Sequence, residues 1–345
     1  MRLTYCSYFH EFKHPFGVSS NTRKNTPVVF VKIEKDGLSG FGEACLPAYL
    51  GETVEQTNRF LEKVKIVLPH LSDLPCVQDL LDRIDLLDEG HNAAKAAMDM
   101  ALNDLFSKIA GKPFYEWIGT QKPQPRATSF TIGIDSEEKL IQKIQEAEKF
   151  SILKIKAGTK DDKALIELVR KHTTKPLYVD ANQAWTDKYQ VLDLISMMKE
   201  NGVLLVEQAM PVNMKADMRW VTERSVLPTI ADESVKRLID LENLEEAFSG
   251  INIKLMKCTG LNEAIKMIAF AKKKNIQIML GCMAESSCAT TAMAHLMASA
   301  DFIDLDAPEL YTNDPFSGLR YEKGLIQVSD GIGLGVQAKD EMLPF

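Results

Sequence analysis

The sequence predicts an α/β protein with a modified (β/α)8 TIM-type barrel, of pattern (β/α)7β, and an α+β capping domain. The length is 345 residues, which exceeds the roughly 200–250 residues of a barrel and leaves room for a second module. From about residue 126 onward, short β-rich runs alternate with helical stretches. The residues before that point do not alternate in this way, so we expect them to form the separate module.

Residues 1–120 are predicted to form most of the capping domain. Val28–Glu34 is rich in β-formers, a turn signal follows it, and Ser39–Glu43 completes a hairpin. Thr53–Leu68 has apolar residues at helical spacing, and Asn92–Ile109 is an alanine- and methionine-rich helix. Strands followed by helices are typical of an α+β module.

Residues 121–310 are predicted to form the barrel, and residues 311–345 to pack back on the capping domain. The eight β runs are Ala127–Ile132, Ile152–Ala157, Leu177–Asp180, Val203–Glu207, Pro228–Ala231, Ile251–Leu255, Ile276–Leu280 and Phe302–Leu305. Helices are expected between them, among others at Lys163–His172, Tyr189–Asn201, Asn243–Phe248 and Asn262–Lys274. The alternative is a doubly wound open sheet, which normally carries a G-x-G-x-x-G turn after its first strand. No such turn follows the first run here.

Composition narrows the classes of partner. The net charge is −7 without a dense basic block, which argues against nucleic acid and anionic membrane surfaces. Neither a signal peptide nor a membrane span is expected, because no sufficiently long apolar stretch occurs. The six cysteines include no C-x-x-C pair, as is typical of reduced thiols in a cytoplasmic protein. Assembly into a homo-oligomer is left open.

Three acidic residues stand at the ends of successive β runs. Asp180 ends the third run, Glu207 ends the fourth, and Asp232 follows the fifth. A barrel builds its active site where the carboxyl ends of its strands meet. One such residue alone is more often a helix cap or a loop charge. Acids at the ends of three successive strands instead favour a shared site. Converging carboxylates repel each other unless a hard cation holds them, so we expect one Mg²⁺ per subunit, with Mn²⁺ as the alternative.

Lysines are expected on both sides of the same barrel mouth. Lys154 and Lys156 lie on the second strand and share a face, and Lys254 lies on the sixth strand, across the axis. A substrate carboxylate on the metal would hold its α-carbon between Lys156 and Lys254. One lysine would remove the α-proton and the other would return a proton to the opposite face, through a metal-stabilised enediolate. Lys154 is given a supporting role, and its repulsion of Lys156, together with the nearby cation, is expected to lower a lysine pKa.

Asp304 and Asp306 are two residues apart on the eighth strand and share a face. That strand lies across the barrel from the fourth. The pair is suited to a cation about one dipeptide length from the substrate carboxylate, and a free α-ammonium is the obvious candidate. A structural or solvated pair of aspartates explains the pattern equally well.

These motifs resemble those of the enolase superfamily, muconate-lactonising subgroup. They are LKIKAG (153–158), VDANQAW (179–185), VEQ (206–208), ADES (231–234) and NIKLMKCTG (252–260), with GFGEA (40–44) in the capping domain. Within the subgroup, the Asp-x-Asp motif is similar to that of dipeptide epimerases, including the Ala-Glu epimerases, where it holds the α-ammonium. The resemblance implies Mg²⁺ on the three acids, the lysines at 156 and 254 as the acid/base pair, and a dipeptide epimerised at its C-terminal residue.

One segment departs from that resemblance. The Ala-Glu epimerases have a stretch like KPFKTALRT near the start, with an arginine that meets a glutamate side chain. Here the stretch is HPFGVSSNTRK (14–24), which is longer, and Arg23 is displaced by two residues. Arg23 remains the candidate for binding the substrate side chain, and loops near 14–24 and 45–53 are expected to line the pocket. The side chain is expected to be apolar or glutamate, with a slight preference for a non-acidic one.

Other functions fit part of the pattern. A muconate cycloisomerase or an o-succinylbenzoate synthase uses similar lysines and acids, but its substrate has no α-ammonium for the pair at 304 and 306. A Schiff-base lyase would use a barrel lysine as a nucleophile and would leave the three metal acids without a role. A non-catalytic, peptide-binding barrel would be expected to have lost at least one of these residues.

Overall fold

The computed structural model describes residues 1–18, 21–71, 76–244 and 246–345. An eight-stranded parallel sheet, in the order β12-β11-β10-β9-β8-β7-β6-β5, forms its centre. The strands are β5 (Ser129–Ile132), β6 (Ile152–Lys156), β7 (Leu177–Asp180), β8 (Val203–Glu207), β9 (Thr229–Ala231), β10 (Gly250–Ile253), β11 (Gln277–Gly281) and β12 (Phe302–Asp304). Each of the eight predicted runs overlaps one of these strands.

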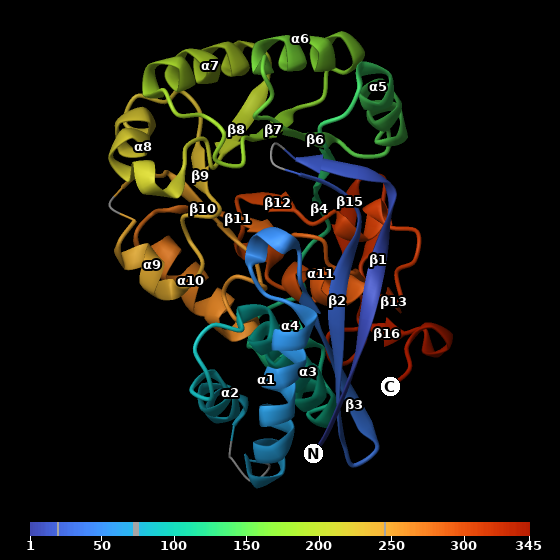
Figure 1. Ribbon diagram of the computed structural model, residues 1–345. Helices are drawn as coiled ribbons and strands as arrows, with labels where there is room; N and C mark the ends of the chain where they lie inside the picture. Colours follow the sequence, from blue (N-terminus) through green and yellow to red (C-terminus); the bar gives the residue numbers. More distant parts are fainter. Residues whose placement is uncertain (19–20, 72–75, 245) are drawn as a thin grey trace.

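Helices connect consecutive strands and cover the outside of the barrel (Figure 1). In the described chain they are α5 (Glu137–Glu146), α6 (Asp162–His172), α7 (Lys188–Glu200), α8 (Lys215–Thr222), α9 (Leu238–Glu242), α10 (Leu261–Lys273) and α11 (Ser287–Ala294). One α-helix thus follows each strand from β5 to β11, which confirms the predicted (β/α)7β pattern. Within the residues described, the chain forms no helix with the length and apolar character needed to span a bilayer.

The barrel strands are mostly buried because helices cover one face and inward side chains fill the other. All four residues of β7 are buried, for example. Side chains join the two edge strands, β5 and β12. Ser129 Oγ donates a hydrogen bond to Asp304 Oδ1 at 2.7 Å, and the Leu305 backbone N–H donates to Thr128 Oγ1 at 2.8 Å. These bonds close the barrel next to the aspartate pair predicted from the sequence.

The capping domain contains an antiparallel sheet of three strands, β1 (Arg2–Val18), β2 (Asn21–Lys35) and β3 (Leu38–Cys45). The hairpin predicted from the sequence is its β2–β3 part, so β1 was missed. Helices α1 (Val54–Val67), α2 (Val77–Asp85), α3 (Asn92–Ile109) and α4 (Phe114–Trp117) complete the domain. The sheet lies so close to α3 that a Cβ added to Gly42 would meet Ala97 O at 1.9 Å. This close approach requires glycine in the GFGEA segment.

The carboxyl-terminal segment runs back along the capping sheet (Figure 1). The side chain of Asn313 donates to Phe9 O at 2.8 Å, and the rings of Phe30 and Phe316 lie 5.1 Å apart. Its short strands are β13 (Phe316–Ser317), β14 (Arg320–Glu322), β15 (Leu325–Gln327) and β16 (Gln337–Ala338), and β15 also pairs with β4 (Arg126–Ala127). The domain boundaries near residues 120 and 310 stay predictions.

The helix expected at Asn243–Phe248 is wrong. Residue 245 lies outside the described residues, and the helix of this connection, α9, is instead at Leu238–Glu242. The Asp240 carboxylate accepts from the backbone N–H groups that precede the helix, at 2.8 and 2.9 Å, and so fixes its start. Glu246 has a left-handed backbone with φ of 60°, which a helix cannot continue through.

A fully buried carboxylate, Glu43 of the GFGEA segment, joins the capping sheet to the barrel. Its oxygens accept from Ser286 N at 2.9 Å, from Ser286 Oγ at 2.5 Å and from Ala289 N at 3.3 Å. His10 Nε2 lies 3.2 Å from the same carboxylate. The acceptor thus lies at the amino terminus of α11, where a negative charge is favourable.

We predict that Glu43→Ala lowers the free energy of unfolding by about 3 kcal/mol, because it leaves buried donors without an acceptor. Urea unfolding followed by circular dichroism measures this change. Glu62→Ala is the matched control, because the exposed Glu62 carboxylate accepts from the Tyr5 hydroxyl on the surface, and its loss is expected to change stability by less than about 0.5 kcal/mol. A similar loss in both variants would contradict the role given to Glu43.

Candidate active site

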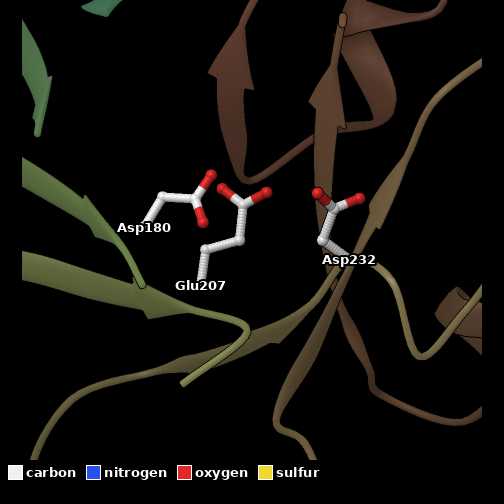
Figure 2. Close-up of side chains that lie close together, drawn as sticks. All are labelled: Asp180, Glu207 and Asp232. Carbon is white, nitrogen blue, oxygen red and sulfur yellow. The ribbon is translucent and has the colours of Figure 1, made fainter. Parts of the chain in front are cut away.

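The structure brings together the three acids that the sequence predicts as metal ligands. Asp180 ends β7, Glu207 ends β8, and Asp232 follows β9. Figure 2 shows their carboxylates directed into one region. One oxygen from each lies within 4.8 Å of the others, and all three side chains are buried. This all-oxygen donor set suits a hard divalent cation such as Mg²⁺ or Mn²⁺.

Burial and neighbouring charges give these acids unequal pKa values. Burial and the adjacent Asp180 carboxylate raise the pKa of Glu207 to about 7. Burial also opposes ionisation of Asp180, but Lys156 and Lys154 outweigh it and lower the pKa of that acid to about 2. Additional positive charge between the acids would favour the ionised form of Glu207, which is the contribution expected of a divalent cation.

Lys154 and Lys156 both lie on β6 but differ in their surroundings. Lys154 is 2% exposed, and its Nζ lies 3.2 Å from Asp180, 2.7 Å from Glu207 and 2.7 Å from Asp304. The Lys156 side chain is 11% exposed, and its Nζ lies 2.7 Å from Asp180. Burial lowers the pKa of Lys154, but its carboxylate neighbours raise it well above the ordinary value. A lysine pKa lowered by the second lysine together with the nearby cation stays a prediction.

Two lysines from the end of β10 contact Asp232. Lys254 Nζ lies 2.7 Å from Asp232 Oδ2, and Lys257 Nζ lies 2.6 Å from Oδ1. Burial raises the pKa of Asp232, but the two ammonium groups outweigh it and hold that pKa well below its usual range. Asp232 in turn helps to raise the pKa of Lys254 well above its ordinary value, against the effect of burial. Lys257 was not predicted as a site residue, because its spacing of three from Lys254 placed it in the loop after the strand.

Two buried amides hold residues of the metal site, one at a side chain and one at the backbone. Asn252 Nδ2 donates to Glu207 Oε1 at 2.8 Å. Gln208 Oε1 accepts from the backbone N–H groups of Asp232 at 2.9 Å and of Ser234 at 3.1 Å. Both amides occur inside the recognised motifs, but nothing in their spacing assigned them these partners.

The two aspartates at the end of β12 have different partners. Asp304 uses both oxygens within the protein, because Oδ1 accepts from Ser129 and Oδ2 from Lys154, each at 2.7 Å. Asp306 Oδ2 accepts from the Thr131 backbone N–H at 2.5 Å. Burial and the nearby Asp304 raise the pKa of Asp306 to about 7. A cation bound at Asp306 would favour its ionised form.

A cavity of about 250 Å³ joins these groups. Its wall includes Lys156, Lys254 and Asp306 from the barrel, and Arg23 and Tyr49 from the capping domain. The volume lies near the lower end of the roughly 300–1,000 Å³ typical of small-molecule pockets. Both capping segments expected to line the pocket, near 14–24 and 45–53, therefore contribute to it.

Arg23 reaches the cavity despite its displaced position in the sequence. Its guanidinium carbon lies 5.4 Å from the ring centre of Phe12, 5.8 Å from that of Phe16 and 5.8 Å from that of Tyr49. Cation–π contacts of this kind hold a guanidinium in place without neutralising its charge. Ser19 and Ser20 of the same segment lie outside the described residues.

Comparisons with known proteins cover nearly the whole chain. Residues 4–119 match the model of the mandelate racemase / muconate lactonizing enzyme N-terminal domain, and residues 137–342 match the enolase C-terminal domain-like family. The chain is 45% identical over 337 residues to the L-Ala-D/L-Glu epimerase of Bacteroides thetaiotaomicron, covering 97% of this chain and 88% of that protein.

Solved structures of dipeptide epimerases have the same fold. The substrate-liganded L-Ala-D/L-Glu epimerase from Bacillus subtilis matches with a TM-score of 0.92 and 29% identity, over 98% of both chains. The dipeptide epimerase from Enterococcus faecalis V583, complexed with Mg and L-Leu-L-Tyr, matches with a TM-score of 0.90 and 30% identity, over 97% of this chain and 99% of that chain. This protein therefore belongs to the enolase superfamily, in its mandelate racemase and muconate lactonizing enzyme group.

Proposed function

We propose that the protein, a dipeptide epimerase, inverts the α-carbon of the C-terminal residue of a dipeptide by a two-lysine proton transfer. Lys156 and Lys254 are the acid/base pair, and Asp180, Glu207 and Asp232 hold one Mg²⁺ per subunit, with Mn²⁺ as the alternative. One observation carries the proposal: both lysines line the same cavity, and the three acids come from the strands between them.

The lysines approach from opposite sides of the barrel. Lys156 ends β6 and Lys254 follows β10, four strands further along the sheet. A carbon between the two amines presents one face to each. The neutral amine of one lysine takes the α-proton, and the ammonium of the other gives a proton to the opposite face. The carbon is inverted, and the two lysines have exchanged protonation states.

The metal-site residues fit a resident divalent ion, and the Enterococcus relative was crystallised with Mg. When bound, Mg²⁺ supplies the positive charge that stabilises the enediolate formed as the α-proton leaves. Lys156 and Lys254 each lie 2.7 Å from one of the metal-site carboxylates. These contacts support the proposal that both amines work at a carbon beside the bound substrate carboxylate.

The substrate α-ammonium is proposed to bind Asp306. Both oxygens of Asp304 already accept hydrogen bonds from protein partners, so we give it a positioning role through Lys154. Lys154 in turn connects Asp304 to Glu207, with its Nζ 2.7 Å from each. This division refines the expectation that the two aspartates act alike, and keeps Lys154 in its supporting role.

The side chain of the second residue is proposed to be acidic, with Arg23 as its partner. Arg23 lines the cavity and its contacts are aromatic rings, so its charge remains for a substrate carboxylate. The Bacteroides relative is an L-Ala-D/L-Glu epimerase. These observations favour glutamate as the second residue. The longer segment at 14–24 had slightly favoured an apolar side chain.

We also propose that the enzyme works in the cytoplasm. All six cysteines are free thiols, and most of them are buried. Cys282 lines the cavity beside Asp306, where an oxidised sulfur would change the polarity of the site. A reducing compartment keeps that thiol intact.

We predict that Lys156→Ala and Lys254→Ala each slow epimerisation by about 10²–10⁴-fold. Each variant should still exchange the α-proton of one diastereomer, because the remaining lysine faces only one side of the carbon. Proton NMR in D₂O with Mg²⁺, on L-Ala-L-Glu and L-Ala-D-Glu, measures both effects. Lys163→Ala, an exposed site on α6, is the control and should behave as wild type. Exchange of both diastereomers at the wild-type rate by either active-site variant would remove that lysine from the mechanism.

We predict that removing divalent ions with a chelator abolishes α-proton exchange and that added Mg²⁺ restores it. Asp180→Asn should not recover at the same Mg²⁺ concentration, because the site loses one anionic ligand. The measurement is the NMR exchange rate before and after chelation. Full activity in chelator, with borohydride trapping of substrate on a lysine, would instead establish the Schiff-base alternative.

We predict that Arg23→Met lowers kcat/KM for L-Ala-L-Glu by about 10–100-fold, the effect of losing a hydrogen bond to a charged group. Activity on L-Ala-L-Leu should fall far less, since its side chain has no carboxylate. Lys24→Met is the matched control, because it removes the same charge from the exposed neighbouring residue. An equal loss on both dipeptides would show that Arg23 supports the loop and does not select the side chain.

A further inference from the structure

A buried lysine that the proposed reaction does not use lies directly behind the metal site. Lys257 Nζ donates to Asp232 Oδ1 at 2.6 Å, to Asp232 O at 2.6 Å and to Asn252 O at 3.0 Å. An ammonium group has three N–H donors, so each donor has an acceptor. A buried charge that is fully hydrogen-bonded in this way is held in one position.

The two oxygens of Asp232 serve different lysines. Lys254 contacts Oδ2 at 2.7 Å and lies 3.8 Å from Glu207 Oε1. Lys257 contacts Oδ1. Of the two lysines, only Lys254 lines the cavity. Oδ2 is therefore the oxygen directed toward the reacting groups, and Oδ1 is the oxygen that Lys257 holds.

Asp232 is fixed at its backbone as well as at its side chain. Its N–H donates to Gln208 Oε1 at 2.9 Å, and its carbonyl accepts from Lys257. Lys257 contacts this residue at two separate atoms, one on the backbone and one on the carboxylate. Rotation of the carboxylate would break the second contact while the first held the ammonium in place.

We propose that Lys257 is a positioning residue of the metal site, which holds Asp232 by Oδ1 and so leaves Oδ2 as its ligand oxygen. The inference rests on the proposed function, because it concerns the affinity of that function's divalent ion. Lys257 acts through Asp232 and does not touch substrate. Of the lysines at positions 154, 156, 254 and 257, the last thus serves to orient a metal ligand.

Charge and geometry make opposite predictions for this residue. An ammonium near a cation site repels the cation, so its removal would tighten metal binding. A hydrogen bond that fixes a ligand has the reverse effect, and the loss of such a partner typically costs 10–100-fold in metal affinity. We expect geometry to dominate, because without Lys257 two buried carbonyls each lose a donor and the Asp232 carboxylate loses one of its two lysine contacts.

The test is a titration of the full-length enzyme with Mn²⁺, followed by electron paramagnetic resonance of the free ion. Lys257→Met is expected to raise the Kd for Mn²⁺ about 10–100-fold, and Lys257→Gln, whose amide nitrogen keeps two of the three N–H donors, to raise it less. Lys236→Met is the matched control, because it removes an equal charge from an exposed residue four positions after Asp232, and should leave the Kd unchanged. Circular dichroism gives the folded fraction to which each Kd refers.

Each result decides between geometry and charge. An unchanged Kd in folded Lys257→Met would reduce the lysine to a packing role, and a lower Kd would make repulsion its main effect; both overturn the proposal. If Lys257→Met does not fold, Lys257→Gln is judged by the same criterion. Wild-type protein that binds no Mn²⁺ would instead overturn the metal site of the proposed function.

Discussion

The mutual repulsion of three buried carboxylates is the constraint on which the rest of the structure depends. Asp180, Glu207 and Asp232 lie together because parallel strands all end on one face of a barrel. Each acid has a lysine within 3 Å. These lysines come from β6 and from the end of β10, the strands on either side of the acids. Charge balance at the metal site thus places bases on opposite sides of the cavity, which is the arrangement that proton transfer across a carbon requires.

The same charge pairing connects the two ends of the substrate site. Lys154 lies 2.7 Å from Glu207 at the metal end and 2.7 Å from Asp304 at the other end. Asp304 is also bonded to Ser129, which closes the barrel between β12 and β5. The distance between Glu207 and Asp304 is therefore set by buried bonds of the barrel itself. In the proposed function, these bonds fix both ends of the site, so that the barrel would select substrates by length.

Residues whose role follows from their position at a strand end could be predicted from the sequence. Residues whose role depends on a contact with a distant part of the chain could not. Ionisable residues directly after apolar runs predicted the metal acids and the paired lysines, since a barrel brings strand ends together. Gln208 and Lys257 were missed because their role lies in contacts with Asp232, about 25 residues away in the chain. Helix α11 has no amphipathic pattern for another reason: all its residues are buried, so it has no polar face to give a helical period.

Arg23 shows how strand pairing positions a residue of the capping loop that residue spacing alone does not place. Relative to Pro15-Phe16, this arginine lies two residues later than its counterpart in the Ala-Glu epimerases. Its residue spacing therefore did not place it at the cavity. In the β1–β2 ribbon, Phe16 pairs with Arg23, Gly17 with Thr22 and Val18 with Asn21. The longer segment therefore keeps Arg23 directly opposite Phe16, and both residues line the cavity. In the proposed function, side-chain selection and proton transfer thereby belong to different parts of the chain, because Arg23 lies on the ribbon while the lysines lie at the strand ends of the barrel.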